Sequence, residues 1–280
     1  MYKSAARHYQ SPALIEDVPV VNLPSVKDLF QLVLDQVNRP KQSIVTYLNV
    51  HVANTAYENT ELKRFLKQAD FVYCDGAGIQ VGAKILGQPE IDIRLPAADW
   101  FIDFFRFMAE SGKTVYLLGG QPGVSSRMQA VLDEQVSEHT LVGHHHGYIL
   151  KEPEVETSVI DEINRLKPDV LIVGFGTPLQ EEWITRCQER LDVSVIWPLG
   201  AVMDYFTGAT QRCPKWMGDM GFEWLYRLML EPGRMAGRYV KGNPWFLTRM
   251  FFSRMMHDYT YFRRVLAINL HRGRKAMLQG

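Results

Sequence analysis

Three apolar runs, each followed at once by a glycine-containing turn, constrain the fold of this chain more than any other feature. The runs are Thr114–Leu118, Val170–Val173 and Ser194–Pro198. Between them, Ser125–Gln135 and Glu154–Leu166 show the apolar spacing of helices. Strands that alternate with helices form βαβ units. We therefore predict an α/β fold, with a Rossmann-like, mostly parallel sheet flanked by helices.

The N-terminal part of the chain continues this pattern. The first 24 residues contain three prolines and are expected to be irregular, and Ser25 is placed to cap a helix that ends near Asn38. The next segments are expected in the order strand, helix, helix, strand, helix: Ser43–Leu48, Val50–Tyr57, Glu61–Gln68, Phe71–Cys74 and Ile79–Leu86. Ligands bind at the carboxyl ends of the strands in such sheets, so residues directly after each strand are the candidates for a functional site.

The charge distribution divides the chain. Its 31 Lys and Arg residues balance 31 Asp and Glu residues, yet residues 212–280 carry 13 basic side chains against 4 acidic ones. We expect an α/β catalytic domain over residues 1–211 and a basic, helical, membrane-proximal appendage over residues 212–280. Helices are predicted over Glu223–Glu231 and Pro244–Leu270. The excess of positive charge indicates contact with an anionic partner.

Several observations favour a cytoplasmic protein that meets a membrane only at its surface. The N-terminus lacks the apolar core of a signal peptide, and no run of about 18 apolar residues is present. Three scattered cysteines fit a reducing compartment. A basic amphipathic C-terminal helix can lie on an anionic leaflet. Packing of that helix on the core, or a homo-oligomer interface, explains the same pattern.

Asp75 is the first candidate for chemistry. It follows the predicted strand Phe71–Cys74 and precedes Gly76 and Gly78, which allow a sharp turn and close approach of a ligand. A carboxylate in this position can accept a proton from an attacking hydroxyl. The alternative is an aspartate that only hydrogen-bonds its own turn.

Two glycine turns are candidates for binding phosphate. Gly119 and Gly120 follow the strand Thr114–Leu118, and Gly174 and Gly176 follow the strand Val170–Val173. Free N–H groups at the start of a helix favour anions, and Gln180 could add an amide ligand for a sugar or a phosphate. A plain turn, or a capped helix start, explains each motif as well.

Three arginines of the basic segment form the next candidate. Arg227, Arg234 and Arg238 are spaced so that one helix would present them on one face, although Pro232 and Gly233 interrupt the helix. Guanidinium groups suit a diphosphate.

The sequence gives less support for metals, dinucleotides or nucleic acids as ligands. His144, His145 and His146 lack a third metal ligand at a suitable spacing, since neighbouring positions on a strand point to opposite faces. No Asp-x-Asp pair for Mg²⁺ is present, so no metal site is predicted. The GxGxxG fingerprint of dinucleotide-binding oxidoreductases is absent, and no nucleic-acid motif accompanies the basic charge. Asp204 could line the site or cap the last turn of the sheet.

Taken in order, these segments resemble the WecG/TagA/CpsF family of glycosyltransferases, glycosyltransferase family 26. The resemblance rests on the ordered blocks YLNVHVANTAYENTELKRFLKQADFVYCDGAGIQVGAKILG, LLGG, GHHHGYI, PDVLIVGFGTPLQEEWI, PLGAVMDYFTGATQRCPKW and GFEWLYRLMLEPGRMAGRY. It covers the chain from about Val45 to Tyr239, and we expect the residues beyond Tyr239 to lie outside the family. The family commonly has Thr where Tyr47 stands and Ala where Cys213 stands.

The resemblance implies an inverting, metal-independent transferase. It would move a sugar from a UDP-sugar, with no cofactor, to a polyprenyl-diphosphate-linked acceptor in cell-surface or exopolysaccharide synthesis. It implies that Asp75 is the catalytic base, and it assigns substrate binding to further positions: Tyr47, Asn49, Arg94, Gln180, Arg227, Arg234 and Arg238. The last three belong to an appendage that closes over the site and is linked to membrane association. The alternative is a non-catalytic module that binds a nucleotide-sugar or a lipid at the membrane surface.

Overall fold

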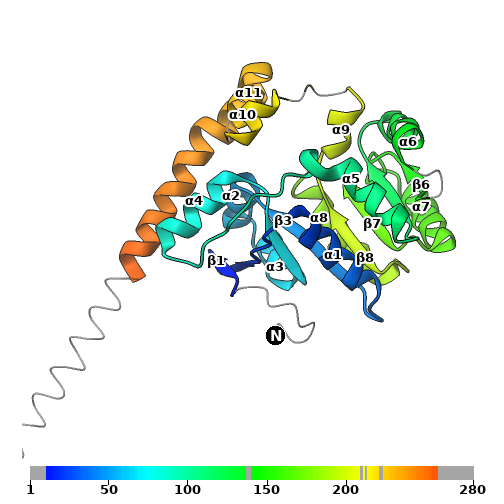
Figure 1. Cartoon of the computed structure of the whole chain (residues 1–280), viewed down its shortest axis with the longest axis horizontal. Coiled ribbons are helices and arrows are strands. Elements are labelled where there is room, and N and C mark those ends of the chain that lie inside the picture. Colours follow the sequence, from blue (N-terminus) through cyan, green and yellow to red (C-terminus); the bar gives the residue numbers. More distant parts are fainter. Residues whose placement is uncertain (1–10, 137–139, 209–210, 212, 221–222, 258–280) are drawn as a thin grey trace, which may run out of the picture.

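The computed structural model describes residues 11–136, 140–208, 211, 213–220 and 223–257. At its centre is a parallel sheet of six strands in the order β4-β3-β8-β7-β5-β6 (Figure 1). The strands are β3 (Ser43–Leu48), β4 (Phe71–Cys74), β5 (Val115–Gly119), β6 (Leu141–His145), β7 (Val170–Gly174) and β8 (Val195–Pro198). This arrangement confirms the predicted α/β fold with a parallel sheet.

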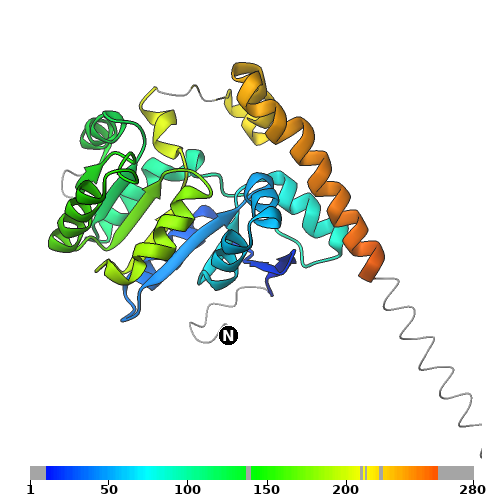
Figure 2. The ribbon, with the colours of Figure 1, turned by 180° about the vertical axis from the view of Figure 1, so that it is seen from behind.

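Helices cover both faces of the sheet, as the burial of the strands requires. Every residue of β5 and β7 is buried, which is the pattern of strands covered on both sides. One apolar cluster joins the sheet to α1 (Val26–Val37), α5 (Ala97–Glu110) and α6 (Val124–Gln135). A second cluster, on the other face (Figure 2), joins it to α2 (Val50–Glu58), α3 (Thr60–Gln68), α4 (Ala77–Leu86), α7 (Pro153–Leu166) and α8 (Leu179–Cys187).

The N-terminal hairpin and the long helix α5 (Ala97–Glu110) were not expected from the sequence. Residues 1–24 were predicted to be irregular, but β1 (Ala13–Ile15) and β2 (Val18–Val20) form an antiparallel hairpin. Strands of three residues are too short to show a clear alternation. Helix α5 was also missed; its Trp100 stacks on Trp197 of β8 with ring centroids 5.0 Å apart. By contrast, the predicted cap of α1 is confirmed, because the Ser25 hydroxyl accepts the N–H of Asp28 at 3.2 Å.

The C-terminal quarter is helical, as predicted. It contains α10 (Lys215–Asp219), α11 (Glu223–Leu230) and α12 (Pro232–Ala236), and α12 continues through a π-helical turn (Gly237–Lys241) into a helix over residues 242–257. The long helix therefore begins at Pro232, earlier than the predicted Pro244, which lies inside the helix just after the π-helical turn. The predicted end at Leu270 lies outside the described residues. We refer to residues 213–257 as the appendage.

The appendage packs on the sheet domain through its last helix, which runs beside α4 (Figure 1). Phe246 and Met250 are fully buried and belong to the same apolar cluster as α2 and α4. A Cβ atom on Gly82 would lie only 2.8 Å from Phe246 Cζ, so glycine at this position lets helix and ring meet closely. The amide of Asn54 also donates to the carbonyl of Gly242 at 2.8 Å.

Arg249 adds a charged contact beside this apolar one. Its side chain lies 3.2 Å from a carboxylate oxygen of Glu16 and donates to Asn54 Oδ1 at 2.8 Å. Its guanidinium carbon is 4.1 Å from the ring centroid of Tyr57, a cation–π distance. Arg249 is only 8% exposed, so solvent screens its charge little and the Glu16 carboxylate serves as its ion-pair partner. The N-terminal hairpin, α2 and the appendage helix are thereby joined.

We expect Arg249→Ala to lower the free energy of unfolding by about 2–4 kcal/mol, because it leaves Glu16 partly buried without its counter-charge. Chemical denaturation measures the loss, and limited proteolysis should show faster cleavage within residues 232–257. Thr248→Ala, an exposed neighbour on the same helix, is the control and should change neither. Equal stability of the two variants would contradict the anchoring role of Arg249.

Candidate active site

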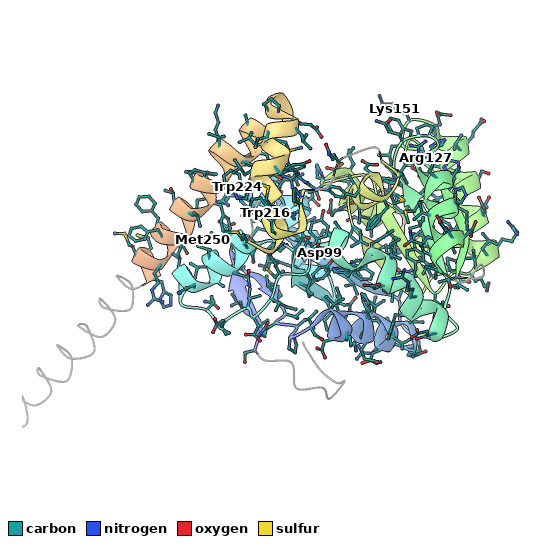
Figure 3. The ribbon with its side chains drawn as sticks, turned by 45° about the horizontal axis from the view of Figure 1, so that its top comes forward. Asp99, Arg127, Lys151, Trp216, Trp224 and Met250 are labelled. Carbon is teal, nitrogen blue, oxygen red and sulfur yellow. The ribbon has the colours of Figure 1, made fainter. Side chains whose placement is uncertain are left out.

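A cavity of about 630 Å³ lies between the carboxyl edge of the sheet and the appendage. Its sheet side is formed by residues that follow β3, β4, β7 and β8, among them Asn49, Asp75, Thr177 and Gly200. Its other side is formed by the appendage residues Trp224, Arg227, Met235, Arg238, Tyr239, Asn243 and Leu247. Figure 3 shows Trp216, Trp224 and Met250 together on the appendage, whereas Arg127 and Lys151 lie at the far end of the molecule.

Asp75 enters the cavity because it is the first residue after β4. Its N–H donates to the carbonyl of Leu48 at 3.0 Å, which extends the parallel pairing by one residue. Its Oδ2 accepts a hydrogen bond of 2.8 Å from the side-chain amide of Asn49, which directly follows β3. Asn49 is itself fixed, because its Oδ1 caps α2 by accepting the N–H of Val52 at 3.0 Å. The Asp75 carboxylate thus has a defined orientation.

Burial and the neighbouring polar and charged groups shift the pKa of the Asp75 carboxyl group in opposite directions. Burial raises the pKa of the Asp75 carboxyl group; the hydrogen bond from Asn49 and the charges of Arg227, Arg238 and Arg94 lower it, and the raised value is the net result. A carboxyl group with a raised pKa holds a proton more firmly than an exposed aspartate. It is therefore a better acceptor of a proton from a hydroxyl group near neutral pH.

Guanidinium groups reach the cavity from both sides. Arg227 lies on α11, with its guanidinium carbon 4.8 Å from the ring centroid of Tyr205. Arg238 lies in the π-helical turn, and its Nε is buried without a hydrogen-bond partner among the described residues. Arg94, on the sheet side, donates to the carbonyl of Gly218 in α10. These groups could bind a diphosphate. Arg234 belongs to α12, but its side chain lies outside the described residues.

Gln180 is placed differently from what the sequence suggested. It is fully buried and does not line the cavity. Its Nε2 donates to Glu181 Oε1 at 2.8 Å, and its Oε1 accepts the N–H of Gly200 at 3.0 Å. The amide therefore has no free group for a ligand and instead holds the turn after β8 in place.

Packing explains three of the four glycines in these turns. Gly176 lines the cavity, but Gly119, Gly120 and Gly174 do not. A Cβ atom on Gly119 would lie 2.6 Å from the carbonyl oxygen of Gly174, and one on Gly174 would lie 2.7 Å from that of Gly200. The backbone at Gly120 also requires glycine, because its φ is 72° and a Cβ atom there would lie 2.6 Å from a side-chain atom of Val124. These glycines allow the ends of β5, β7 and β8 to approach one another.

Sequence reasoning missed several residues of the cavity. His51, two residues after Asn49, faces it, and burial followed by the charge of Arg238 lowers the pKa of His51 to about 4. This imidazole is neutral at physiological pH. The aromatic residues Tyr205, Trp224 and Tyr239 also line the cavity, and the sequence indicated no role for them.

Tyr47 lines the cavity as expected. Burial is the main cause that raises the pKa of its hydroxyl group, and the nearby Asp75 carboxylate adds to the rise. The group therefore stays protonated and can donate a hydrogen bond.

The histidine run forms no metal centre in the described part of the chain. The ring nitrogen of His144 lies 3.3 Å from the hydroxyl of Ser125, and the rings of His145 and His146 are 4.2 Å apart. Among the described residues, no three His, Cys, Asp or Glu side chains gather around one point. Asp204 lies in α9 (Val202–Phe206) and is not among the residues that line the cavity.

Comparison with known proteins assigns the chain to a family. The sequence model described as "Glycosyl transferase WecG/TagA/CpsF family" matches residues 14–259. The chain belongs to this family. It is therefore a member of a glycosyltransferase family, and the similarity extends to residue 259, well beyond the expected limit at Tyr239.

Similar curated proteins come from Staphylococcus aureus. The enzyme named N-acetylglucosaminyldiphosphoundecaprenol N-acetyl-beta-D-mannosaminyltransferase from strain MRSA252 is 29% identical over 202 residues, which are 72% of this chain and 77% of that protein. The proteins with the same name from strains NCTC 8325 / PS 47 and COL give the same values. Within the described residues, no helix combines the length and the apolar character needed to cross a bilayer.

We expect Gly174→Ala to lower the free energy of unfolding by about 1–3 kcal/mol, because the new methyl group would overlap the Gly200 carbonyl. Urea denaturation measures the difference. Gly233→Ala is the matched control, because a Cβ there would meet no described atom within 4 Å apart from its own helix backbone and chain neighbours, and alanine favours a helix. A destabilisation no larger than that of Gly233→Ala would show that the strand ends are not packed as described.

Proposed function

We propose that this protein is an inverting, metal-independent glycosyltransferase that moves a sugar from a UDP-sugar to a polyprenyl-diphosphate-linked acceptor. The observation that carries the proposal is one cavity in which an oriented carboxylate, Asp75, faces arginines from both walls. The family and the names of the similar staphylococcal enzymes support it. Cell-surface or exopolysaccharide synthesis is the corresponding process.

In the proposed reaction, Asp75 accepts the proton of the acceptor hydroxyl group. The hydroxyl oxygen attacks the anomeric carbon on the face opposite the nucleotide, and the bond between that carbon and the diphosphate oxygen breaks. UDP leaves with the electron pair, so a single displacement inverts the configuration. Asn49 keeps the Asp75 carboxylate aimed at the acceptor, since it holds Oδ2 at 2.8 Å.

The departing UDP needs positive charge beside its diphosphate. Arg227, Arg238 and Arg94 approach the same cavity, and their fixed charges would stabilise the leaving group without a proton transfer. Arg234 remains a proposed fourth ligand on the basis of sequence. We propose that residues 212–280 complete the site of a catalytic domain formed by residues 1–211.

The direct test is UDP release by the purified protein, with EDTA present, against a panel of UDP-sugars and polyprenyl-diphosphate-linked saccharides. We expect release that requires one donor and one acceptor together and survives EDTA. Donor binding without release, across the whole panel, would favour the alternative of a non-catalytic nucleotide-sugar-binding module.

We expect Asp75→Asn to lower kcat by about 10²–10⁴-fold, the usual contribution of a general base, while the dissociation constant for the donor stays unchanged. Asp103→Asn, which alters an exposed carboxylate on α5, is the control and should keep full activity. Substantial turnover by Asp75→Asn would remove Asp75 from the role of base.

The pH profile gives a separate check on Asp75. A general base works when ionised, so activity is lost as the pH falls through its pKa. Because burial raises the pKa of Asp75, the acidic limb of kcat/KM should lie above the value of about 3.9 of an exposed aspartate. A limb at or below the exposed value would contradict the described surroundings of Asp75.

We also propose that the appendage binds the anionic inner face of the cell membrane, which makes the protein cytoplasmic and peripheral. The helix over residues 242–257 buries Phe246 and Met250 on one side and exposes Phe251, Phe252, Met255 and Met256 on others. Phe252 and Met256 are 57% and 62% exposed. Apolar side chains on a helix from a basic segment suit a membrane interface.

Phe252→Ser combined with Met256→Ser should lower flotation with vesicles that contain anionic lipid, because apolar area available for insertion is lost. Ser253→Ala, an exposed site between them, serves as the control. Unchanged flotation, together with a smaller assembly in solution than that of the wild type, would instead assign this face to a homo-oligomer interface.

A further inference from the structure

Glu181 lies beneath the cavity floor and has no role in the reaction described above. It belongs to the first turn of α8 and is 2% exposed. One oxygen, Oε1, accepts two hydrogen bonds: from the hydroxyl of Thr177 at 2.9 Å and from Nε2 of Gln180 at 2.8 Å. The other oxygen, Oε2, is buried and has no hydrogen-bond partner in the part of the chain that the structure describes.

These contacts connect Glu181 to two stretches of the cavity wall. Thr177 lines the cavity directly, after β7. Gln180 connects Glu181 to the second stretch, because its Oε1 accepts the N–H of Gly200. Gly200 lines the cavity after β8. Tyr47 also touches this region, since a Cβ atom on Gly200 would lie 3.1 Å from the Tyr47 hydroxyl. One carboxyl group thus fixes the floor opposite the appendage.

We propose that Glu181 is a positioning residue of the transfer reaction and that it acts as a neutral carboxylic acid, with its Oε1 holding Thr177 and Gln180. This inference rests on the proposed function for its catalytic part. Its structural part, the protonated state, stands on the contacts alone.

The unpartnered Oε2 decides between the ionised and the neutral form. An ionised carboxylate would place negative charge on buried Oε2, and Glu181 forms no ion pair or Oε2 hydrogen bond among the described residues. In the neutral form the proton lies on Oε2, because Oε1 already accepts two hydrogen bonds. A buried O–H group without a partner costs less free energy than a buried unpaired charge. Among the described residues, the ionisable groups that interact with it include Tyr47 from β3 and Glu182 from its own helix, and neither of them supplies positive charge. Burial accordingly raises the pKa of Glu181, and the bonds from Gln180 and Thr177 offset only part of this rise.

A simpler explanation is that Glu181 only stabilises the start of α8. Acidic residues in a first helical turn interact favourably with the helix dipole, but that effect needs the ionised form and is small beside the cost of burying an unpaired charge. The two explanations predict different behaviour on replacement by glutamine. Glutamine keeps an oxygen acceptor at Oε1 and removes the possibility of ionisation.

Turnover of the full-length protein by Glu181→Gln and Glu181→Ala provides the test, in the UDP-release assay. We expect Glu181→Gln to retain wild-type kcat/KM, and Glu181→Ala to lose about ten- to a hundredfold, the cost of a misplaced site wall. Glu182→Gln, at the exposed neighbouring position, is the control for charge at the helix start and should be silent. A folded Glu181→Gln variant as impaired as Glu181→Ala, or an active Glu181→Ala variant, would overturn the proposal.

A second readout does not depend on activity. Infrared difference spectra of the wild type against Glu181→Gln at neutral pH should show the carbonyl stretch of a protonated carboxyl group in the wild type only. A carboxylate band in its place would overturn the neutral state even if both proteins were active. Absence of turnover by the wild type with every donor and acceptor would instead refute the proposed function, while the infrared band would still decide the state of Glu181.

Discussion

The packing of Phe246 and Met250 against α4, beside Gly82, is the contact on which the rest of the structure depends. The sheet domain supplies Asp75 and Asn49, but the cavity has a second wall only where the appendage helix is held against α4 and α2. A side chain at position 82 would push Phe246 away. The ion pair between Arg249 and Glu16 then fixes the orientation of the same helix, so that the arginines of the appendage face the sheet.

In the resulting site, the Asp75 carboxylate and the arginine guanidinium groups line the same cavity. Three guanidinium groups lower the pKa of Asp75, yet burial outweighs them. This balance matters because a base that is too strongly stabilised by cations would lose its affinity for a proton. The arginines remain close enough to neutralise a departing diphosphate. One cavity can therefore serve both ends of a displacement, proton removal and stabilisation of the leaving group.

The sequence was sufficient to predict the parallel sheet and the place of Asp75, because buried strands followed by turns have a strong local signal. Asn49 was assigned from the family resemblance alone, and its hydrogen bond with Asp75 follows from the pairing of β3 with β4. The sequence could not show that Gly119, Gly174 and Gly200 pack on one another, because a glycine that binds phosphate and one that packs on backbone look alike in sequence. Nor could the sequence show that Gln180 is buried, because its side chain bonds to Gly200, which lies in a different segment of the chain.

The appendage shows where local patterns are insufficient. The arginines were found from their spacing, but the contribution of Trp224, Tyr239 and Leu247 to the cavity depends on tertiary packing that no periodicity reveals. Helix α5 was missed although it is long, and its aromatic residues fill the face of the sheet opposite α8. Contacts between residues far apart in the chain, such as Arg249 with Glu16, lie beyond any reading of single segments.

A crystal structure of the protein with UDP would test most directly whether the cavity between sheet and appendage is the site of transfer. Our account predicts that the diphosphate lies in the cavity, with Arg227 or Arg238 in hydrogen-bond contact and Asp75 facing the position of the sugar. UDP bound instead at the turn formed by Gly119 and Gly120, outside the cavity, would contradict it.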